Sequence, residues 1–142
     1  MPRKPFDAAV SDFVQAVGLL VRRMRAAADS GELSWTEAGV LRLIAREGPA
    51  TTADLARAQG MRPQSMRTIV ATLEEMGMVE RKPHATDGRQ VNIALSAKGT
   101  AAQKTVGDAK RTWLARAILQ LDDEDRDTLF KAGEIVRRLA EK

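Results

Sequence analysis

Residues 61–95 constrain the fold of this chain more than any other segment. The first half, MRPQSMRTIVATLEEMG, has the apolar spacing of an amphipathic helix, with Pro63 near its start and Gly77 at its end. The second half, MVERKPHATDGRQVNIAL, predicts two short strands, Met78–Lys82 and Gln90–Leu95, joined by a polar turn. A helix followed by a basic β-hairpin is typical of a winged helix-turn-helix, so this segment indicates DNA binding.

Composition narrows the classes of protein that the chain can represent. Its 142 residues, 44% of them hydrophobic, favour one domain, or one domain with helical extensions. There is no cysteine and only one histidine, His84, which excludes disulfides, thiolate nucleophiles and a multi-histidine zinc site within one chain. We therefore expect neither a metal site nor a cofactor. A net charge of +4 is compatible with nucleic acid, and equally with an ordinary basic soluble protein.

The hydropathy pattern argues against membrane insertion and export. No apolar run approaches the length of about 18 residues that a membrane span requires. The first residues, MPRKPFDAAV, are basic but lack the apolar stretch of a signal peptide. We expect a cytoplasmic protein with no membrane partner.

Capping residues and apolar spacing predict five further helices. They are expected at about 7–29, between Ser34 and Gly48, between Thr51 and Gly60, at about 97–120 and at about 123–141. Ser34 and Glu37 form a capping box, and Ser96 and Asp122 are N-cap residues. The expected fold is mainly α (α+β): a winged helix-turn-helix with a two-stranded wing. Its expected parts are an N-terminal dimerisation helix (1–31), the DNA-binding domain (32–98) and C-terminal dimerisation helices (99–142).

The predicted helix at the start of residues 61–95 has two different faces. Met66, Ile69, Leu73 and Met76 share one side, with Val70 at its edge, and Gln64, Arg67, Thr68 and Ala71 share the other. Side chains near the start of a recognition helix reach base edges, where arginine pairs with guanine and glutamine with adenine. Ser65 lies between the faces, in reach of a phosphate or base. The alternative is a solvated helix face with no DNA contact.

The hairpin carries Arg81, Lys82 and Arg89 beside or on its loop. A protruding cationic ribbon can place an arginine in the minor groove, whose negative potential is greatest where it is narrow. Asp87 is expected to accept hydrogen bonds from Arg89 or from loop amides and so to fix the tip of the wing. The alternative is a solvated turn in which Asp87 and Arg89 satisfy each other. His84 is expected to be a surface loop residue and not a switch, with a pH-dependent phosphate contact as the other possibility.

Several of these residues resemble the MarR family of bacterial and archaeal transcriptional regulators. The matching segments are the helix Arg62–Met76, LEEMGMVER at 73–81, Asp87-Gly88-Arg89 and LSAKG at 95–99. Ser96 stands where the family usually has threonine, which keeps the cap. The resemblance implies a homodimer that binds a pseudo-palindromic operator of double-stranded DNA. It also implies that the protein is a repressor, as members of this family usually are. Many members release the DNA when a phenolic or lipophilic small molecule binds. The resemblance further implies that Arg89 is the minor-groove arginine.

The predicted DNA-binding residues are those of the recognition helix and the wing. They are Arg62, Gln64, Ser65, Arg67, Thr68, Arg81, Asp87 and Arg89. For a small-molecule effector the ligand-binding residues are unknown, and Trp35 is the one weak candidate. No cysteine is present to sense peroxide.

The helices at both ends of the chain expose more apolar surface than one small winged helix can cover. The residues that need a partner surface are Val10, Phe13, Val17, Leu20, Trp113, Leu114, Ile118, Leu129, Val136 and Leu139. A two-fold dimer would cover them and place two recognition helices about 34–36 Å apart. The alternative is that these helices fold back on their own chain. The acidic run Asp122–Asp125 is expected to be a helix cap.

Three classes of function compete for this sequence. The preferred one is a dimeric, ligand-responsive transcriptional regulator. The alternative is a winged-helix module that binds proteins and not DNA, although such a module would replace Arg67 and Arg89 with apolar or acidic residues. An enzyme is not expected, because the chain lacks a paired acid and base, an activated nucleophile and a phosphate-binding loop.

Overall fold

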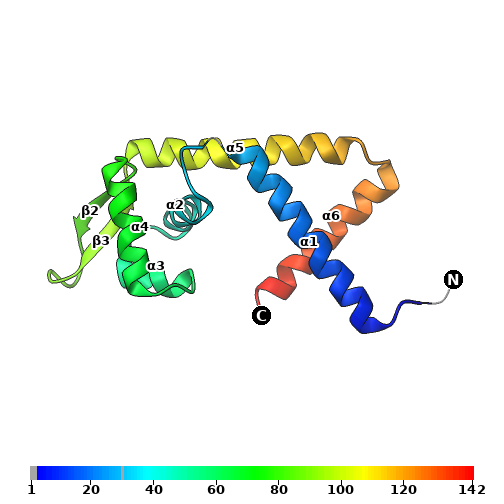
Figure 1. Cartoon of the computed structure of the whole chain (residues 1–142), viewed down its shortest axis with the longest axis horizontal. Coiled ribbons are helices and arrows are strands. Elements are labelled where there is room, and N and C mark those ends of the chain that lie inside the picture. Colours follow the sequence, from blue (N-terminus) through cyan, green and yellow to red (C-terminus); the bar gives the residue numbers. More distant parts are fainter. Residues whose placement is uncertain (1–2, 30) are drawn as a thin grey trace. The chain divides into compact units, whose positions relative to one another are not determined.

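The computed structural model describes residues 3–29 and 31–142, which form six helices and three strands within those ranges (Figure 1). In chain order these are α1 (Phe6–Ala28), α2 (Trp35–Glu47), β1 (Ala50–Thr51), α3 (Thr52–Ala58), α4 (Pro63–Glu75), β2 (Val79–Pro83), β3 (Val91–Leu95), α5 (Ala97–Leu119) and α6 (Asp123–Ala140). The chain divides into two compact units. One contains Ala28–Asp108, and the other contains the two ends of the chain, up to Ala27 and from Ala109.

The unit Ala28–Asp108 holds the hydrophobic core. Helices α2, α3 and α4, the sheet and the turn before β2 supply its buried side chains, which are Val40, Leu41, Leu43, Ile44, Leu55, Ala56, Met66, Val70, Leu73, Met78, Val79 and Ile93. None of the buried side chains among the described residues is polar or charged. The core is therefore held by apolar packing, and the polar residues of α4 and the wing are left on the surface.

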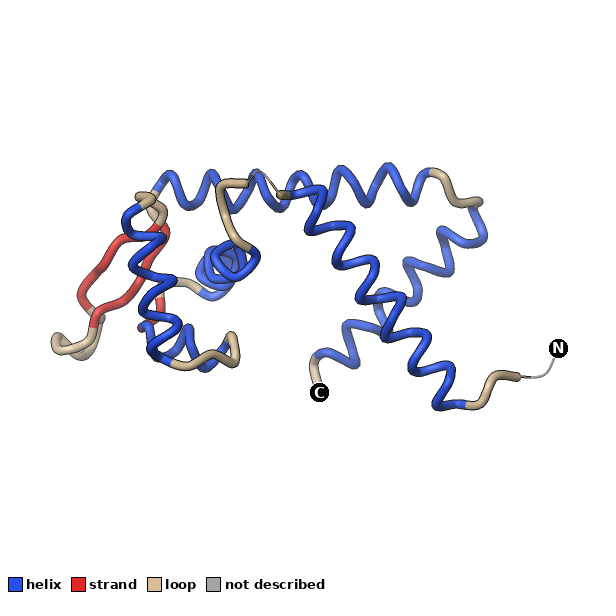
Figure 2. Tube along the Cα trace, viewed as in Figure 1, coloured by secondary structure: helices blue, strands red, loops and turns tan. Residues whose placement is uncertain are grey.

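The sheet has three antiparallel strands in the order β1-β3-β2, so the two-stranded wing is present and gains a partner (Figure 2). Sequence reasoning missed β1, whose two residues pair with Ile93 and Asn92 of β3. The apolar residues Val91, Ile93 and Leu95 at every second position predict alternating burial along β3, and this prediction is wrong in part. Ala94 is buried beside Ile93, and Val91 is exposed. Val91 pairs with Pro83 beside the loop of the wing, where the core no longer covers it.

The helix starts follow the predicted caps. The Ser34 hydroxyl accepts from the Glu37 amide at 3.1 Å, and the Glu37 carboxylate accepts from the Ser34 amide at 2.8 Å. Asp122 accepts from the Asp125 amide at 2.8 Å, which confirms that this acidic run begins a helix. Since these bonds depend on neighbouring residues alone, the sequence predicts them well.

A close backbone contact joins the wing to the start of α5. The Ser96 amide donates to the Met78 carbonyl oxygen at 3.0 Å, and the Gly99 amide donates to the Ser96 hydroxyl at 3.0 Å. Lys98 Nζ donates to the Met76 carbonyl oxygen at 2.8 Å at the end of α4. A Cβ atom on Gly99 would lie 1.9 Å from the Met78 oxygen, so only glycine fits there without backbone movement.

The second unit consists of α1, α6 and the C-terminal part of α5. Neither α1 nor α6 contains a buried residue. Phe13 and Phe130 are 53% and 58% exposed, and other large apolar side chains of both helices are exposed with them. Over the described residues, no helix is both long enough and apolar enough to cross a membrane.

Candidate nucleic-acid interface

Helix α4 separates a buried side from a polar side. Met66, Val70 and Leu73 are buried in the core, and Ile69 and Met76 pack against it partly buried. Val70 is thus more central than its expected place at the edge. On the polar side, the side chains that sequence reasoning assigned to DNA are all exposed, namely Gln64, Ser65, Arg67 and Thr68, as is Ala71. The helix therefore presents the predicted polar side chains to the surface.

The N-terminal end of α4 is electropositive. Arg62 occupies the N-cap position without using its side chain as a cap, and the first turn contains no acidic residue. Pro63 follows at the first helical position. Among the described residues, neither Arg62 nor Arg67 pairs with an acidic side chain. Unpaired arginines add to the positive end of the helix dipole, and this arrangement favours a negatively charged ligand such as a phosphate group.

The hydroxyl of Thr68 is used in one direction only. It donates to the Gln64 carbonyl oxygen at 3.3 Å, within the same helix. A threonine hydroxyl has one hydrogen and two lone pairs, so the exposed oxygen can still accept a hydrogen bond from outside. Thr68 can therefore accept from a base amino group.

Arg81 connects the wing to the recognition helix. Its Nε lies 3.2 Å and 3.0 Å from the two carboxylate oxygens of Glu74, near the end of α4. This pair spans the turn between α4 and β2, and sequence reasoning did not foresee it. The terminal nitrogens of the Arg81 guanidinium remain as further donors, because only Nε makes these two contacts.

Arg89 and Asp87 form the tip of the wing. The Arg89 side chain is 94% exposed, and its Nε lies 3.6 Å from Asp87 Oδ1. The same carboxylate oxygen accepts from the Arg89 backbone amide at 3.0 Å, which is one of the bonds expected of Asp87. The loop is thus ordered by its own side chains while the Arg89 guanidinium stays open to solvent.

His84 also orders this loop, which the sequence did not reveal. Its Nδ1 accepts from the backbone amides of Thr86 at 3.2 Å and Asp87 at 3.1 Å. His84 lies in the surface loop as expected, but its side chain is half-buried and holds two backbone amides of that loop.

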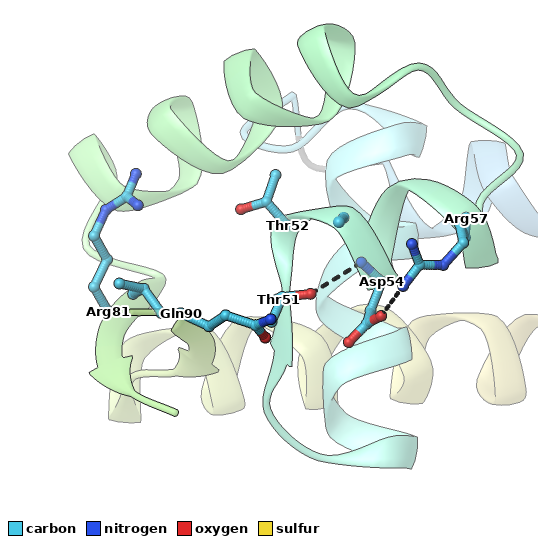
Figure 3. A pocket seen from close by; sticks show the side chains of 8 residues that line it. Thr51, Thr52, Asp54, Arg57, Arg81 and Gln90 are labelled. Atoms are coloured by element: carbon cyan, nitrogen blue, oxygen red, sulfur yellow. Dashed lines mark hydrogen bonds and ion pairs between the residues drawn. The ribbon is translucent and has the colours of Figure 1, made fainter. Parts of the chain in front are cut away.

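A cavity of about 450 Å³ lies between the start of α3 and the wing (Figure 3). Its lining residues are Thr51, Thr52, Ala53, Asp54, Arg57, Arg81, Gln90 and Val91. The pKa of the Asp54 carboxyl lies below its ordinary value. The main cause is a hydrogen bond with the Thr51 side chain, and the Arg57 guanidinium lowers this pKa further. The acidic Asp54 is paired with Arg57 in this lining, as the dashed line in Figure 3 shows.

Trp35, the weak ligand candidate, does not line this cavity. Trp35 as a whole residue is 40% exposed, and the centroid of its ring lies 5.5 Å from the guanidinium carbon of Arg42, a cation–π distance. Over the described residues, no group of three or more histidine, cysteine or acidic side chains is placed to hold a metal ion.

Comparison with known proteins identifies the family. A family model described as the MarR family matches residues 32–90, which include α2 to β2 and the loop of the wing. An HTH-type transcriptional regulator of Mycobacterium leprae is 33% identical over 132 residues, with 93% of this chain and 92% of that protein covered. The chain belongs to the MarR family. As a MarR family protein it is a transcriptional regulator with a DNA-binding helix-turn-helix.

Two further similar proteins extend the comparison. An HTH-type transcriptional repressor of Mycobacterium bovis is 30% identical, covering 81% of this chain and 84% of that protein. The solved structure of a MarR family protein from Bacillus stearothermophilus superposes with a TM-score of 0.84, covering 100% of both chains at 18% identity. That structure confirms the winged helix-turn-helix fold.

Proposed function

We propose that this MarR family protein binds a pseudo-palindromic operator of double-stranded DNA as a homodimer and represses transcription in the cytoplasm. The observation that carries the proposal is the surface of α4. Its N-terminal half exposes Gln64, Ser65, Arg67 and Thr68, and its first turn contains no acidic residue. This combination suits major-groove binding, where helix N-termini meet base edges and phosphates.

Each predicted residue has a role in this proposal. Arg67 and Gln64 read bases, and Ser65 and Thr68 add hydrogen bonds to bases or phosphates. Arg62, at the cap, contacts a phosphate. Arg89 enters the minor groove from the tip of the wing, and Asp87 fixes the loop without facing DNA.

Arg81 has two roles in the proposal. Its Nε holds β2 to Glu74 of α4, so the wing keeps a fixed position beside the recognition helix. Its terminal nitrogens remain available for a phosphate. Because the side chain is half exposed, such a contact needs no rearrangement of the ion pair.

Dimerisation is inferred from the terminal helices. Neither α1 nor α6 contains a fully buried residue within one chain, yet both carry large exposed apolar side chains. Contiguous apolar surface of this kind marks a protein–protein interface. A second copy is the partner we propose, since a two-fold dimer presents two equal recognition helices to a palindromic site.

The repressor role is supported by a relative. The Mycobacterium bovis relative is named a transcriptional repressor, and we extend that role to this chain. We further propose that a phenolic or lipophilic small molecule releases the DNA, as the family resemblance implies. Six of the eight residues that line the cavity beside α3 are polar or charged, so we do not assign the small molecule to this cavity.

The proposal is tested with DNA selected from a random pool by the full-length protein. The selected fragments should share two inverted half-sites, and their affinity, measured by fluorescence anisotropy, should fall steeply with salt. The slope of log affinity against log salt should be about −0.9 per phosphate neutralised. A flat salt response together with a failure to select any sequence would favour the protein-binding alternative.

A further inference from the structure

Three hydrogen bonds close the loop of the wing. Two join backbone groups, and the third joins a backbone amide to a side chain. The His84 amide donates to the Gln90 carbonyl oxygen at 3.1 Å, and the Gln90 amide donates to the Asp87 carbonyl oxygen at 3.0 Å. The Asp87 side chain then accepts from the Arg89 amide at 3.0 Å. The backbone of Arg89 therefore depends on where the Asp87 backbone lies.

The backbone of Asp87 is in turn held by His84. Nδ1 of the imidazole ring accepts from the Thr86 amide at 3.2 Å and the Asp87 amide at 3.1 Å, and the Thr86 hydroxyl lies 3.3 Å from the same nitrogen. An acceptor that faces two amides carries no hydrogen itself, so the ring hydrogen belongs on Nε2. This arrangement joins His84 to Asp87 and, through Asp87, to Arg89.

We propose that His84 is a positioning residue for Arg89: its Nδ1 holds the loop in the conformation that presents the Arg89 guanidinium to DNA. The inference rests on the proposed DNA-binding function and assigns His84 a task within it. The ring itself need not touch DNA. The opposing possibility is that the ring contacts a phosphate directly, in which case its acceptor geometry is incidental.

Three substitutions distinguish these possibilities. In His84→Asn the amide oxygen is separated from Cβ by the same number of bonds as Nδ1, so it can accept from the same two amides. His84→Ala has no acceptor. His84→Gln is the matched control, because it keeps the amide group but moves the oxygen one carbon further from the backbone.

The first measurement is the affinity of the full-length variants for the selected DNA. We expect His84→Ala and His84→Gln to weaken binding by roughly 3- to 10-fold, the effect of losing one or two net hydrogen bonds. His84→Asn should bind within about twofold of the original protein. Equal losses in the Asn and Ala variants would overturn the proposal in favour of a direct contact of the ring, and no loss in any variant would overturn it outright.

The second measurement uses the free protein, without DNA. Because His84 is the sole histidine, the nitrogen NMR signals of its ring are unambiguous. Recorded at alkaline pH, where the ring is neutral, they should show hydrogen on Nε2 and none on Nδ1. The Thr86 and Asp87 amides should exchange with solvent faster in His84→Ala than in His84→Asn. Equal exchange rates, or hydrogen on Nδ1, would overturn the proposal even if DNA binds. If the NMR and exchange results are as expected but the protein selects no DNA, the proposed function is contradicted instead.

Discussion

Gly99 packs directly against the backbone of Met78 in the unit Ala28–Asp108. Its missing side chain lets α5 begin against the Met78 carbonyl, where a Cβ atom would come within 1.9 Å of the oxygen. The obstacle is backbone and cannot rotate away. The resemblance of LSAKG at 95–99 to a family motif thus has a steric explanation in this chain.

We expect Gly99→Ala to lower the free energy of unfolding by about 1–3 kcal/mol, the usual cost of overpacking. Urea denaturation measures it. The matched control is Gly39→Ala in α2, where a Cβ atom would meet its nearest neighbour, Gln59, at an ordinary 3.7 Å. This control should leave stability unchanged or raise it by up to about 1 kcal/mol, because alanine favours helix. Equal effects at both positions would contradict the steric explanation.

Arg89→Ala should weaken binding to the selected DNA by about tenfold or more, or ~1.4 kcal/mol, with folding unaffected. The side chain is 94% exposed and contributes nothing to the core. Arg46→Ala is the control, since it removes the same charge from an exposed residue at the end of α2. Anisotropy titrations and thermal melting would measure the two effects. An unchanged affinity in Arg89→Ala would contradict the proposed role of the wing.

Helices were predictable here because their ends are set by nearby residues. Capping at Ser34 and Asp122 and glycine at Gly48 fixed the boundaries to within about two residues. Strand β1 was not predictable, since two residues carry no periodicity and their partners lie some forty residues away in β3. The contacts within the wing were only partly predictable. Asp87 has a recognisable turn motif, whereas the His84 contacts and the Glu74–Arg81 pair depend on how the chain turns in space.

Thr51→Val should shorten or loosen α3, because the Thr51 hydroxyl accepts from the Asp54 amide at 3.1 Å as the N-cap. We expect a loss of about 1 kcal/mol in unfolding free energy, measured with urea. Thr52→Val is the control, being the adjacent threonine without the capping bond. Similar losses in both variants would show that the cap contributes little.

Thr51→Val should also raise the pKa of the Asp54 carboxyl towards its ordinary value, since hydrogen bonding with Thr51 is the main cause that lowers this pKa. Because folding lowers this pKa, the ionised carboxyl stabilises the folded chain above its unfolded-state pKa. That contribution is lost as the pH falls through the folded-state pKa. The stability difference between the original protein and Thr51→Val should therefore shrink in acid. Carbon NMR titration of the Asp54 carboxyl measures the shift, and an unchanged titration would contradict the assignment.

For the whole protein, the decisive property is that its terminal helices have no core of their own. Phe13 in α1 is 53% exposed and belongs to the apolar stripe of that helix. The sequence predicted the stripes, since apolar spacing is a local pattern. That a second copy covers these stripes stays a prediction, because local spacing does not distinguish a partner surface from one on the same chain.

Phe13→Glu should raise the dimer dissociation constant about 30-fold or more, the effect of losing a central apolar contact worth about 2 kcal/mol. Sedimentation equilibrium measures it, and affinity for a two-half-site DNA should fall in parallel. Gln15→Glu is the matched control, because it adds the same charge to an exposed polar position of α1. The proposed assembly is contradicted if the unsubstituted protein is a monomer, or if the two variants form dimers of equal stability.

The division of α4 into two sides has a consequence for divergence among related regulators. The buried side chains Met66, Val70 and Leu73 hold the helix, and the exposed Gln64 and Arg67 take no part in the core. Substitutions at the exposed positions can therefore accumulate at little cost in stability. If Gln64 and Arg67 read bases as proposed, gene duplication followed by a few such changes would give a copy that recognises a new promoter while folding as before.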